Sequence, residues 1–397
     1  MVRVDEALAT ILALAQPLGH ETVGLTEARG RILAADIVAD DDLPAMPRSS
    51  VDGYAVIAGD DAADFHVLEE VTAGRLAQAR VSAGTAVRIM TGGTLPHGAD
   101  AVVMVEEVEE TNGRAVLEHR PRRGENVHPP GMDLTRGQHV LSAGTRIGSA
   151  EVGLLATVGC ARVPVFKRPG VAVLATGDEL VEPHQTPPPG SVRDSNRYAL
   201  MAAAEDAGAQ VVWHGHALDD EAVLERAMRE GLAAADVLLT SGGVSMGTRD
   251  LIKPLLDKMA TIHFGRVSFK PGKPLTFATT TEGKLAFGLP GFPVSSLVTF
   301  EVFVRPALLK LGGAANVLRP RVEVALGHEI RPDAVRPEYQ RATVTWENHQ
   351  FVARTTGLQS SSRLMSIVGA NALLELAPGT DPLPAGTMVK ALLLANL

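Results

Sequence analysis

A chain of 397 residues carries 37 Lys and Arg against 46 Asp and Glu, a formal net charge of −9, and 45% of its residues are apolar. At roughly 100 to 200 residues per domain this length predicts about two to four domains, and its single cysteine excludes an internal disulfide or a Cys-rich zinc site, which favours a reducing cytoplasm. An acidic chain with 4% aromatic residues lacks the basic, aromatic surface of a nucleic-acid binder, so no nucleic-acid partner is expected.

The first 45 residues predict a helix at Val4–Leu14, where apolar residues repeat with a helical period. Charges within this segment distinguish it from a secretory signal peptide, so export is not expected. An acidic turn at residues 40–42 and a proline-containing loop at 43–47 mark a boundary. Short apolar runs at 54–57, 86–90 and 101–105 then alternate with turn residues, which predicts a β-rich domain at residues 46–136.

Residues 137–167 return to a mixture of strand and one helix, which we expect at Ser149–Val158. We predict that this piece closes back on residues 1–45 to form one discontinuous, mixed α/β domain. The β-rich domain would then be an insertion. Cys160 in this piece is interpreted as a small core residue rather than a nucleophile.

Strands and helices alternate from residue 168 to 318, as is typical of a doubly wound parallel α/β sheet. Strands are expected at 170–174, 209–213 and 236–239, and helices at 196–207, 221–235, 250–259 and 294–311, the last with a kink at Pro306. Residues 319–397 predict a C-terminal all-β, barrel-like domain. The longest uncharged run, residues 285–300, is interrupted by glycine and proline and falls short of the ~20 apolar residues that cross a bilayer, so no membrane segment is expected.

Acidic residues follow three of the expected parallel strands, at the edge of the sheet where ligands bind. Asp178 and Glu179 follow the first strand, Asp219 the second, and a glycine-rich loop leading to Asp250 the third. Backbone N–H groups of such a loop can bind an anion, and nearby carboxylates usually act on a phosphate through Mg²⁺. Asp219 and Asp250 also suit helix capping, and the loop lacks the spacing of a P-loop.

Cations and hydroxyl groups follow in the next two loops. Arg266, Lys270 and Lys273 surround a rigid proline turn that could present charge to an anion or be a solvated surface loop. Ser295 lies at the start of the last helix, where N–H groups could bind an oxyanion. In the β-rich domain, turn chemistry explains Asp52 and Thr91 about as well as function does.

Several segments, in this order, closely resemble the MoeA-type molybdopterin molybdotransferase family, which is related to the E-domain of gephyrin. They are Ser50-Val51-Asp52-Gly53-Tyr54-Ala55, Arg88-Ile89-Met90-Thr91-Gly92, Thr176-Gly177-Asp178-Glu179-Leu180, Ser241-Gly242-Gly243-Val244-Ser245, Lys270-Pro271-Gly272-Lys273-Pro274 and Leu289-Pro290-Gly291. The resemblance covers essentially the whole chain.

This resemblance implies an enzyme that inserts molybdate into the dithiolene of adenylated molybdopterin, with Mg²⁺ as cofactor, releasing AMP and the molybdenum cofactor. It implies four regions, with residues 1–45 and 137–167 linking and dimerising an elongated homodimer. The second region of one subunit would face the third and fourth of the other. Partners would include the preceding adenylyltransferase and recipient apo-molybdoenzymes.

The family's functional positions carry over by motif. Asp52, Thr91 and Asp133 would reach the neighbouring subunit's site, with both aspartates catalytic. Asp178 would bind substrate, and Glu179, Asp219 and Asp250 would be catalytic residues and Mg²⁺ ligands. The remaining substrate contacts implied are Ser241, Gly242, Gly243, Ser245, Arg266, Lys270, Lys273, Pro290, Ser295 and, on weaker motifs, Arg341 and Ser361.

Three positions depart from the family pattern. Phe292 stands where the Leu-Pro-Gly-Asn-Pro motif has Asn, which removes a hydrogen-bonding side chain. Arg266 replaces a common Lys, and His128 stands where an Arg often precedes Gly131-Met132-Asp133. No principal acid is lost.

Two other functions fit parts of the pattern. Adenylyltransferases that make the substrate share the doubly wound domain and its Ser-Gly-Gly motif, but the three additional regions argue against that activity. A scaffold is the other alternative, because gephyrin also clusters membrane receptors. The chain has no long linker or second catalytic domain, and a scaffold would not need the acidic residues.

Overall fold

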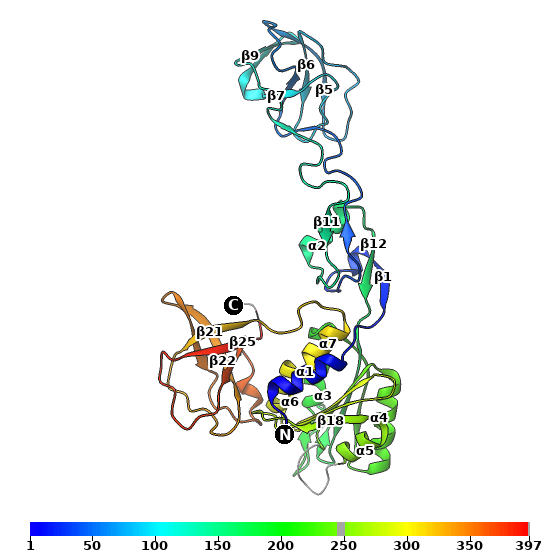
Figure 1. Cartoon of the computed structure of the whole chain (residues 1–397), viewed down its shortest axis with the longest axis vertical. Helices are drawn as coiled ribbons and strands as arrows, with labels where there is room; N and C mark the ends of the chain where they lie inside the picture. Colours follow the sequence, from blue (N-terminus) through cyan, green and yellow to red (C-terminus); the bar gives the residue numbers. More distant parts are fainter. Residues whose placement is uncertain (244–250, 396–397) are drawn as a thin grey trace. The chain divides into compact units, whose positions relative to one another are not determined.

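The computed structural model describes residues 1–243 and 251–395. The chain divides into two compact units: residues 1–35, 143–148 and 162–397 form the first, and residues 36–142 and 149–161 form the second. Each is described by itself below, with element labels as in Figure 1. The division into four domains stays a prediction.

The first unit is built around a six-stranded sheet in the order β16-β13-β17-β20-β19-β18. Neighbouring strands from β16 to β20 run parallel, whereas β19 and β18 are added antiparallel, an addition that the predicted parallel sheet did not include. The strands are β13 (Gly170–Thr176), β16 (Gln210–Ala217), β17 (Val237–Ser241), β18 (Thr261–Arg266), β19 (Pro274–Thr279) and β20 (Leu285–Leu289).

Helices cover both faces of this sheet, so its central strands are buried throughout. Val171 and Val173 of β13 pack into one hydrophobic core, and Ala172 and Leu174 pack into the other, as the alternation of a strand requires. The helices are α1 (Val4–Leu14), α3 (Asn196–Asp206), α6 (Pro293–Thr299) and α7 (Arg305–Leu311) on one side, and α4 (Glu221–Ala234) and α5 (Ile252–Met259) on the other (Figure 1).

The helix expected at 294–311 is continuous in direction but changes its hydrogen bonding in the middle. A π-helical segment at Phe300–Val304 separates α6 from α7. Pro306 lies two residues beyond this segment. Proline has no N–H to donate and crowds the carbonyl four residues earlier, so a wider turn before it relieves the conflict. The predicted irregularity therefore lies one turn before the proline.

A closed five-stranded barrel in the order β21-β23-β22-β24-β25 completes the first unit, together with the small pair β1–β12. Alternate barrel residues such as Val324, Val344 and Leu374 fill its interior. The strands are β21 (Arg321–Leu326), β22 (Glu338–Glu347), β23 (Gln350–Thr355), β24 (Ala372–Leu376), β25 (Met388–Leu393), β1 (His20–Gly24), β12 (Arg162–Phe166) and the short β14 (Leu180–Val181) and β15 (Val192–Arg193).

The second unit is a β-structure with one helix, α2 (Ser149–Thr157). Its main sheet has the order β7-β4-β6-β5-β9-β8, and the pairs β10–β3 and β11–β2 accompany it. The strands are β2 (Ile37–Val38), β3 (Arg48–Ser49), β4 (Gly53–Val56), β5 (Phe65–Val71), β6 (Thr85–Ile89), β7 (Ala101–Met104), β8 (Val108–Thr111), β9 (Arg114–Leu117), β10 (Val127–His128) and β11 (His139–Leu141).

The sequence-based elements agree closely with this structure. The helix Val4–Leu14 begins and ends as predicted, and α2, α3 and α4 each end one residue early. Among the helices that the structure describes, none combines the length and apolar character needed to cross a lipid bilayer.

Candidate functional site

A cavity of about 850 Å³ in the described part of the first unit, called the large cavity below, opens at the carboxyl ends of β13, β17 and β20. This is the edge where a doubly wound sheet binds its ligands. Its wall is completed by the turn at residues 270–274 and by the barrel loop at 359–361. The lining residues are Thr176, Gly177, Glu179, Asp219, Gly242, Gly243, Lys270, Pro271, Gly272, Lys273, Pro274, Pro290, Gly291, Phe292, Ser295, Arg336, Gln359, Ser360 and Ser361.

Two carboxylates line the acidic side of the cavity. Glu179 follows β13 and Asp219 follows β16, and these strands pair in parallel, so both loops leave the sheet at one edge. The backbone N–H of Asp219 donates to Asp178 Oδ1 at 3.0 Å, which ties the two loops together. The helix-cap interpretation of Asp219 is wrong: its neighbour Asp220 caps α4, accepting from the Val223 N–H at 3.0 Å.

The glycine-rich loop after β17 approaches its neighbours too closely for a side chain. Gly242 has φ +101°, and a Cβ atom there would lie 2.5 Å from the Thr176 carbonyl oxygen. Asn196, the first residue of α3, donates through Nδ2 to Ser241 Oγ at 2.8 Å and to the Gly291 carbonyl oxygen at 2.7 Å. One amide group therefore joins the last residue of β17 to the loop that follows β20.

The basic side of the cavity carries the cations Lys270, Lys273 and Arg336; both lysines lie in the turn before β19, three strands along the sheet from β13. Lys270 Nζ lies 3.0 Å from Glu338 Oε1 and 3.4 Å from Asp333 Oδ2, so much of its charge is neutralised within the protein. Lys273 forms no ion pair with any residue of the described ranges. Burial alone would raise the pKa of Asp333, but hydrogen bonds from the Val335 and Arg336 N–H groups and from the Arg336 guanidinium lower it strongly.

A buried arginine supports the barrel loop from below. Arg341 is fully buried; it donates from Nε and Nη2 to Ser366 Oγ at 3.1 and 3.0 Å and from Nη2 to the Ser360 carbonyl oxygen at 3.3 Å. Burial lowers its pKa to about 10. The backbone N–H of Val294 donates to the Ser361 carbonyl oxygen at 3.1 Å, which joins this loop to the start of α6.

The structure thus brings together nine of the predicted site residues along one cavity. They are Glu179, Asp219, Gly242, Gly243, Lys270, Lys273, Pro290, Ser295 and Ser361. Four others, Asp178, Ser241, Arg266 and Arg341, belong to the same unit but are not among the residues that line it. Ser245 and Asp250 lie outside the described residues. Assignment of these residues to binding and catalysis stays a prediction.

Sequence reasoning missed Thr176 at the end of β13 and three polar lining residues of the barrel, Arg336, Gln359 and Ser360. The barrel residues were missed for one reason. All come from irregular barrel loops that have no strand or helix period. The one available signal was adjacency, since Gln359 and Ser360 directly precede the predicted Ser361.

The second unit holds the other predicted residues, Asp52, Thr91 and Asp133. Thr91 and Asp133 line a separate cavity of about 430 Å³, together with Arg48 and His128 among others. Asp52 Oδ1 accepts from the Thr91 N–H at 2.6 Å and from its hydroxyl at 2.7 Å. These two hydrogen bonds lower the pKa of Asp52, so it is ionised at neutral pH.

The donor set of the large cavity is compatible with Mg²⁺. Within residues 1–243 and 251–395 no group of three or more His, Cys, Asp or Glu is placed to hold a metal ion. However, Mg²⁺ in proteins is commonly bound through one or two carboxylates, several waters and substrate phosphates. Glu179 and Asp219 on one wall supply two such carboxylates.

Comparisons with known proteins cover the whole chain. Residues 2–159 match the model of the MoeA N-terminal region (domain I and II), 172–310 a probable molybdopterin binding domain, and 323–394 the MoeA C-terminal region (domain IV). The chain is 35% identical to the molybdopterin molybdenumtransferase of Nostoc sp., over 94% of this chain and 88% of that protein. It is 34% identical to that of Bacillus subtilis, over 99% and 94%.

Two further likenesses agree. Gephyrin of Dictyostelium discoideum is 37% identical over 100% of this chain, which spans 63% of that longer protein. The crystal structure of the molybdopterin biosynthesis MoeA protein from Pyrococcus horikosii superposes with a TM-score of 0.85 at 29% identity and covers all of both chains.

Proposed function

The chain belongs to the MoeA family of molybdopterin molybdenumtransferases, and on that premise we propose how its large cavity serves the reaction. It is an enzyme of molybdenum cofactor biosynthesis that inserts molybdenum into molybdopterin. We propose that the substrates are adenylated molybdopterin and molybdate, and that AMP leaves as the metal enters.

One observation carries the proposal: a single cavity is lined by two carboxylates, on the loops that follow β13 and β16, and by cations and hydroxyl groups from other loops. The two substrates need both kinds of lining group. Adenylated molybdopterin contains linked phosphates that a carboxylate can approach only through a cation, and molybdate is a tetrahedral dianion that needs cationic and hydroxyl donors. A free volume of about 850 Å³ also lies in the range of sites for ligands of this size.

We assign molybdate to the basic side. Lys273 can give its full charge to the oxyanion, because no acid of the described residues pairs with it, and Arg336 adds a second cation. The Ser295 and Ser361 hydroxyl groups are neutral donors to its oxygens. Arg341 does not line the cavity; it donates a hydrogen bond to the Ser360 carbonyl oxygen and so positions the loop that carries Ser361.

We assign Mg²⁺ to the acidic side, where Glu179 and Asp219 would hold it, with Asp250 as the remaining predicted ligand. When bound there, the ion would offset the negative charge of the linked phosphates during release of AMP. Without it, two carboxylates and the phosphates would repel one another. The N–H groups of the glycine-rich loop at residues 242–243 provide further donors to the phosphates.

We also propose that the active form is a cytoplasmic homodimer. In it, Asp52, Thr91 and Asp133 of one subunit complete the cavity of the other, as the family resemblance implies. Mixing an Asp52→Asn variant with an Asp219→Asn variant tests this: activity should return in the mixture only if sites are shared between subunits. The adenylyltransferase that makes the substrate and the apo-molybdoenzymes that receive the product are the protein partners we expect.

The deciding experiment measures AMP release from adenylated molybdopterin with and without molybdate and Mg²⁺. We expect release to require both, and the product to activate an apo-molybdoenzyme. Formation of adenylated molybdopterin from ATP would identify an adenylyltransferase instead. Tight binding of the adenylated pterin without AMP release would identify a scaffold.

A further inference from the structure

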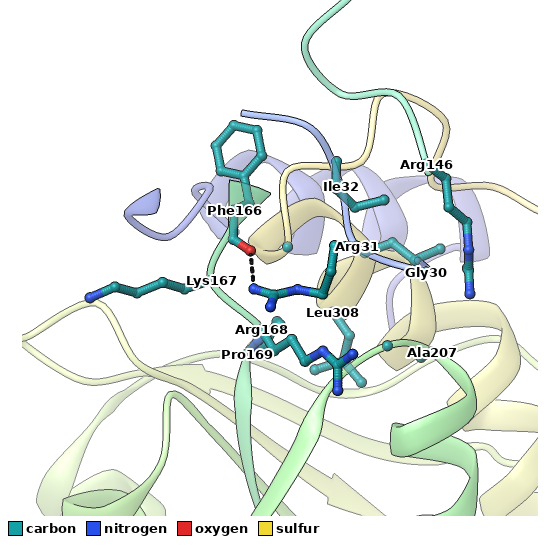
Figure 2. A pocket seen from close by; sticks show the side chains of 13 residues that line it. Gly30, Arg31, Ile32, Arg146, Phe166, Lys167, Arg168, Pro169, Ala207 and Leu308 are labelled. Atoms are coloured by element: carbon teal, nitrogen blue, oxygen red, sulfur yellow. Dashed lines mark hydrogen bonds between the residues drawn. The ribbon is translucent and has the colours of Figure 1, made fainter. Parts of the chain in front are cut away.

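A second cavity of the first unit lies at the opposite, amino-terminal end of β13. The connection Lys167-Arg168-Pro169 between β12 and β13 forms one side of it. The loop around Arg31, the side chain of Arg146 and the ends of α3 and α7 form the others (Figure 2). It shares no lining residue with the large cavity.

Three arginines and an apolar floor define this second cavity. Leu308, Leu309 and Ala207 in the floor are at most 7% exposed. Arg31 is 9% exposed and fixed in place, because its Nη2 donates to Glu21 Oε1 at 2.5 Å and to the Phe166 carbonyl oxygen at 2.8 Å. A buried guanidinium that is already oriented loses little conformational entropy when it binds a further acceptor.

Positive charge around the cavity exceeds the negative charge available to it. No carboxylate lines it, and within the described part of the chain neither Arg146 nor Arg168 has an acidic oxygen within 4.0 Å. Arg305, one helical turn before Leu308 and Leu309, has a buried Nη1 without a hydrogen-bond partner. Burial, together with the nearby charges of Arg319 and Arg146, lowers the pKa of Arg305 to about 10, and the carboxylate of Glu301 offsets only part of this effect.

Helix capping explains only part of this arrangement. The carboxyl ends of α3 and α7 border the cavity, and a cation near a helix carboxyl end is stabilised by the helix dipole. That effect needs neither a cavity nor a cluster of like charges. The backbone N–H groups of Gly30, Lys167, Gly208 and Gly312 all donate within the protein, so these four groups are not free for an anion, and the arginine guanidinium groups supply the charged donors.

We propose that this cavity is a binding site for one free tetrahedral oxyanion of the phosphate class, held by Arg31, Arg146 and Arg168. Its free volume of about 30 Å³ suits an ion of a few heavy atoms and excludes a nucleotide or a pterin. Guanidinium groups bind such oxyanions through pairs of parallel hydrogen bonds. The site is separate from the molybdenum chemistry and does not depend on the proposed function.

Lys167 provides a matched control within the same loop. It adjoins Arg168 in sequence and has the same charge, but its side chain points away from the cavity in Figure 2. General attraction of anions by the basic surface would therefore weaken equally in Lys167→Ala and Arg168→Ala. A specific site would weaken only in the arginine variant.

The test is calorimetric titration of the full chain with inorganic phosphate, sulfate and molybdate at constant ionic strength, with chloride as the reference. We expect one saturable site that weakens at least tenfold in Arg168→Ala and in Arg146→Ala, while Lys167→Ala binds as the unmodified protein does. Both arginines are exposed, so these variants should fold; circular dichroism checks this. Arg168→Lys should restore less than half of the lost binding free energy because lysine lacks the paired donors.

Two results would overturn the proposal: no saturable site that the arginine variants remove, or an equal loss in Lys167→Ala. Oxyanion binding in the large cavity is distinguishable, because it would persist in the Arg146→Ala/Arg168→Ala double variant. Loss of AMP release with oxyanion binding intact would concern the proposed function alone.

Discussion

Replacement of Lys270 by methionine should reduce both stability and activity, whereas the same change at Lys273 should reduce activity alone. Both lysines line the large cavity, but only Lys270 is paired with acids, Glu338 and Asp333. The Glu338 side chain is 4% exposed, so removal of the ammonium leaves a buried carboxylate without its counter-charge. Methionine keeps the apolar stem, which isolates the effect of the charge.

The expected magnitude lies between two limits. Removal of one partner from a fully buried ion pair costs about 3–5 kcal/mol, and an exposed pair is worth about 0–1 kcal/mol. Since the Lys270 side chain is 35% exposed and Glu338 is almost fully buried, we expect a loss of about 1–3 kcal/mol in the free energy of unfolding. Lys273→Met should stay within about 0.5 kcal/mol of the unmodified protein.

A double variant separates the charge effect from any packing effect. Glu338 Oε2 accepts from the Asp333 N–H at 3.0 Å, and the carbonyl oxygen of a glutamine can take over this acceptor role. Lys270→Met/Glu338→Gln should therefore recover at least half of the lost stability but none of the lost AMP release. Urea unfolding followed by circular dichroism measures the first quantity. Unchanged stability of Lys270→Met, or no recovery in the double variant, would refute the reasoning.

Three further outcomes follow from the site. Asp219→Asn should lower Mg²⁺-dependent AMP release at least tenfold with stability unchanged, whereas Asp220→Ala should cost about 1 kcal/mol of stability through its lost helix cap and keep activity; equal effects would contradict the separate roles. Because hydrogen bonds depress the folded-state pKa of Asp333, it stabilises the fold above its unfolded pKa and this contribution is lost as pH falls through the acid range. The stability difference between Asp333→Asn and the unmodified protein, measured by urea unfolding, should therefore be larger at pH 7 than at pH 3. Phe292→Asn should leave stability within about 0.5 kcal/mol, since the ring is 60% exposed, and change KM for the adenylated pterin more than kcat; a reversed pattern in steady-state kinetics would place the ring in the chemical step.

Periodic parts of the fold could be predicted from the sequence, and irregular parts could not. Both ends of helix Val4–Leu14 could be predicted, because its apolar residues repeat with a helical period and the residues on either side do not continue that period. Strands β18 and β19 were not assigned. β19 is buried along most of its length, and a short buried segment has no period that identifies a strand or its direction, whereas in β18 only Phe264 is buried. The irregular turn was predicted at Pro306 but lies before it, at Phe300–Val304. A proline shows that a helical hydrogen bond is lost, but not which neighbouring residues change their hydrogen bonding.

The site followed the same division. Glu179 and Asp219 could be predicted to approach one another because parallel strands end at a common edge. Arg336 could not, because it reaches the cavity from a barrel loop whose path depends on tertiary packing alone. The sequence also did not indicate that Lys270 would form ion pairs with both Asp333 and Glu338, because these pairs depend on how the barrel packs against the sheet.

Asn196 fixes the spacing of two parts of the cavity wall. Its one NH₂ group has two hydrogens: one is donated to Ser241 Oγ at the end of β17, where the glycine-rich loop begins, and the other to the Gly291 carbonyl oxygen in the loop after β20. Because both hydrogen bonds come from one planar amide, the distance between Ser241 and Gly291 is fixed by its geometry. Shorter or differently charged side chains at this position would leave one loop unanchored, and substrate would meet an opening whose width varies between molecules of the same enzyme.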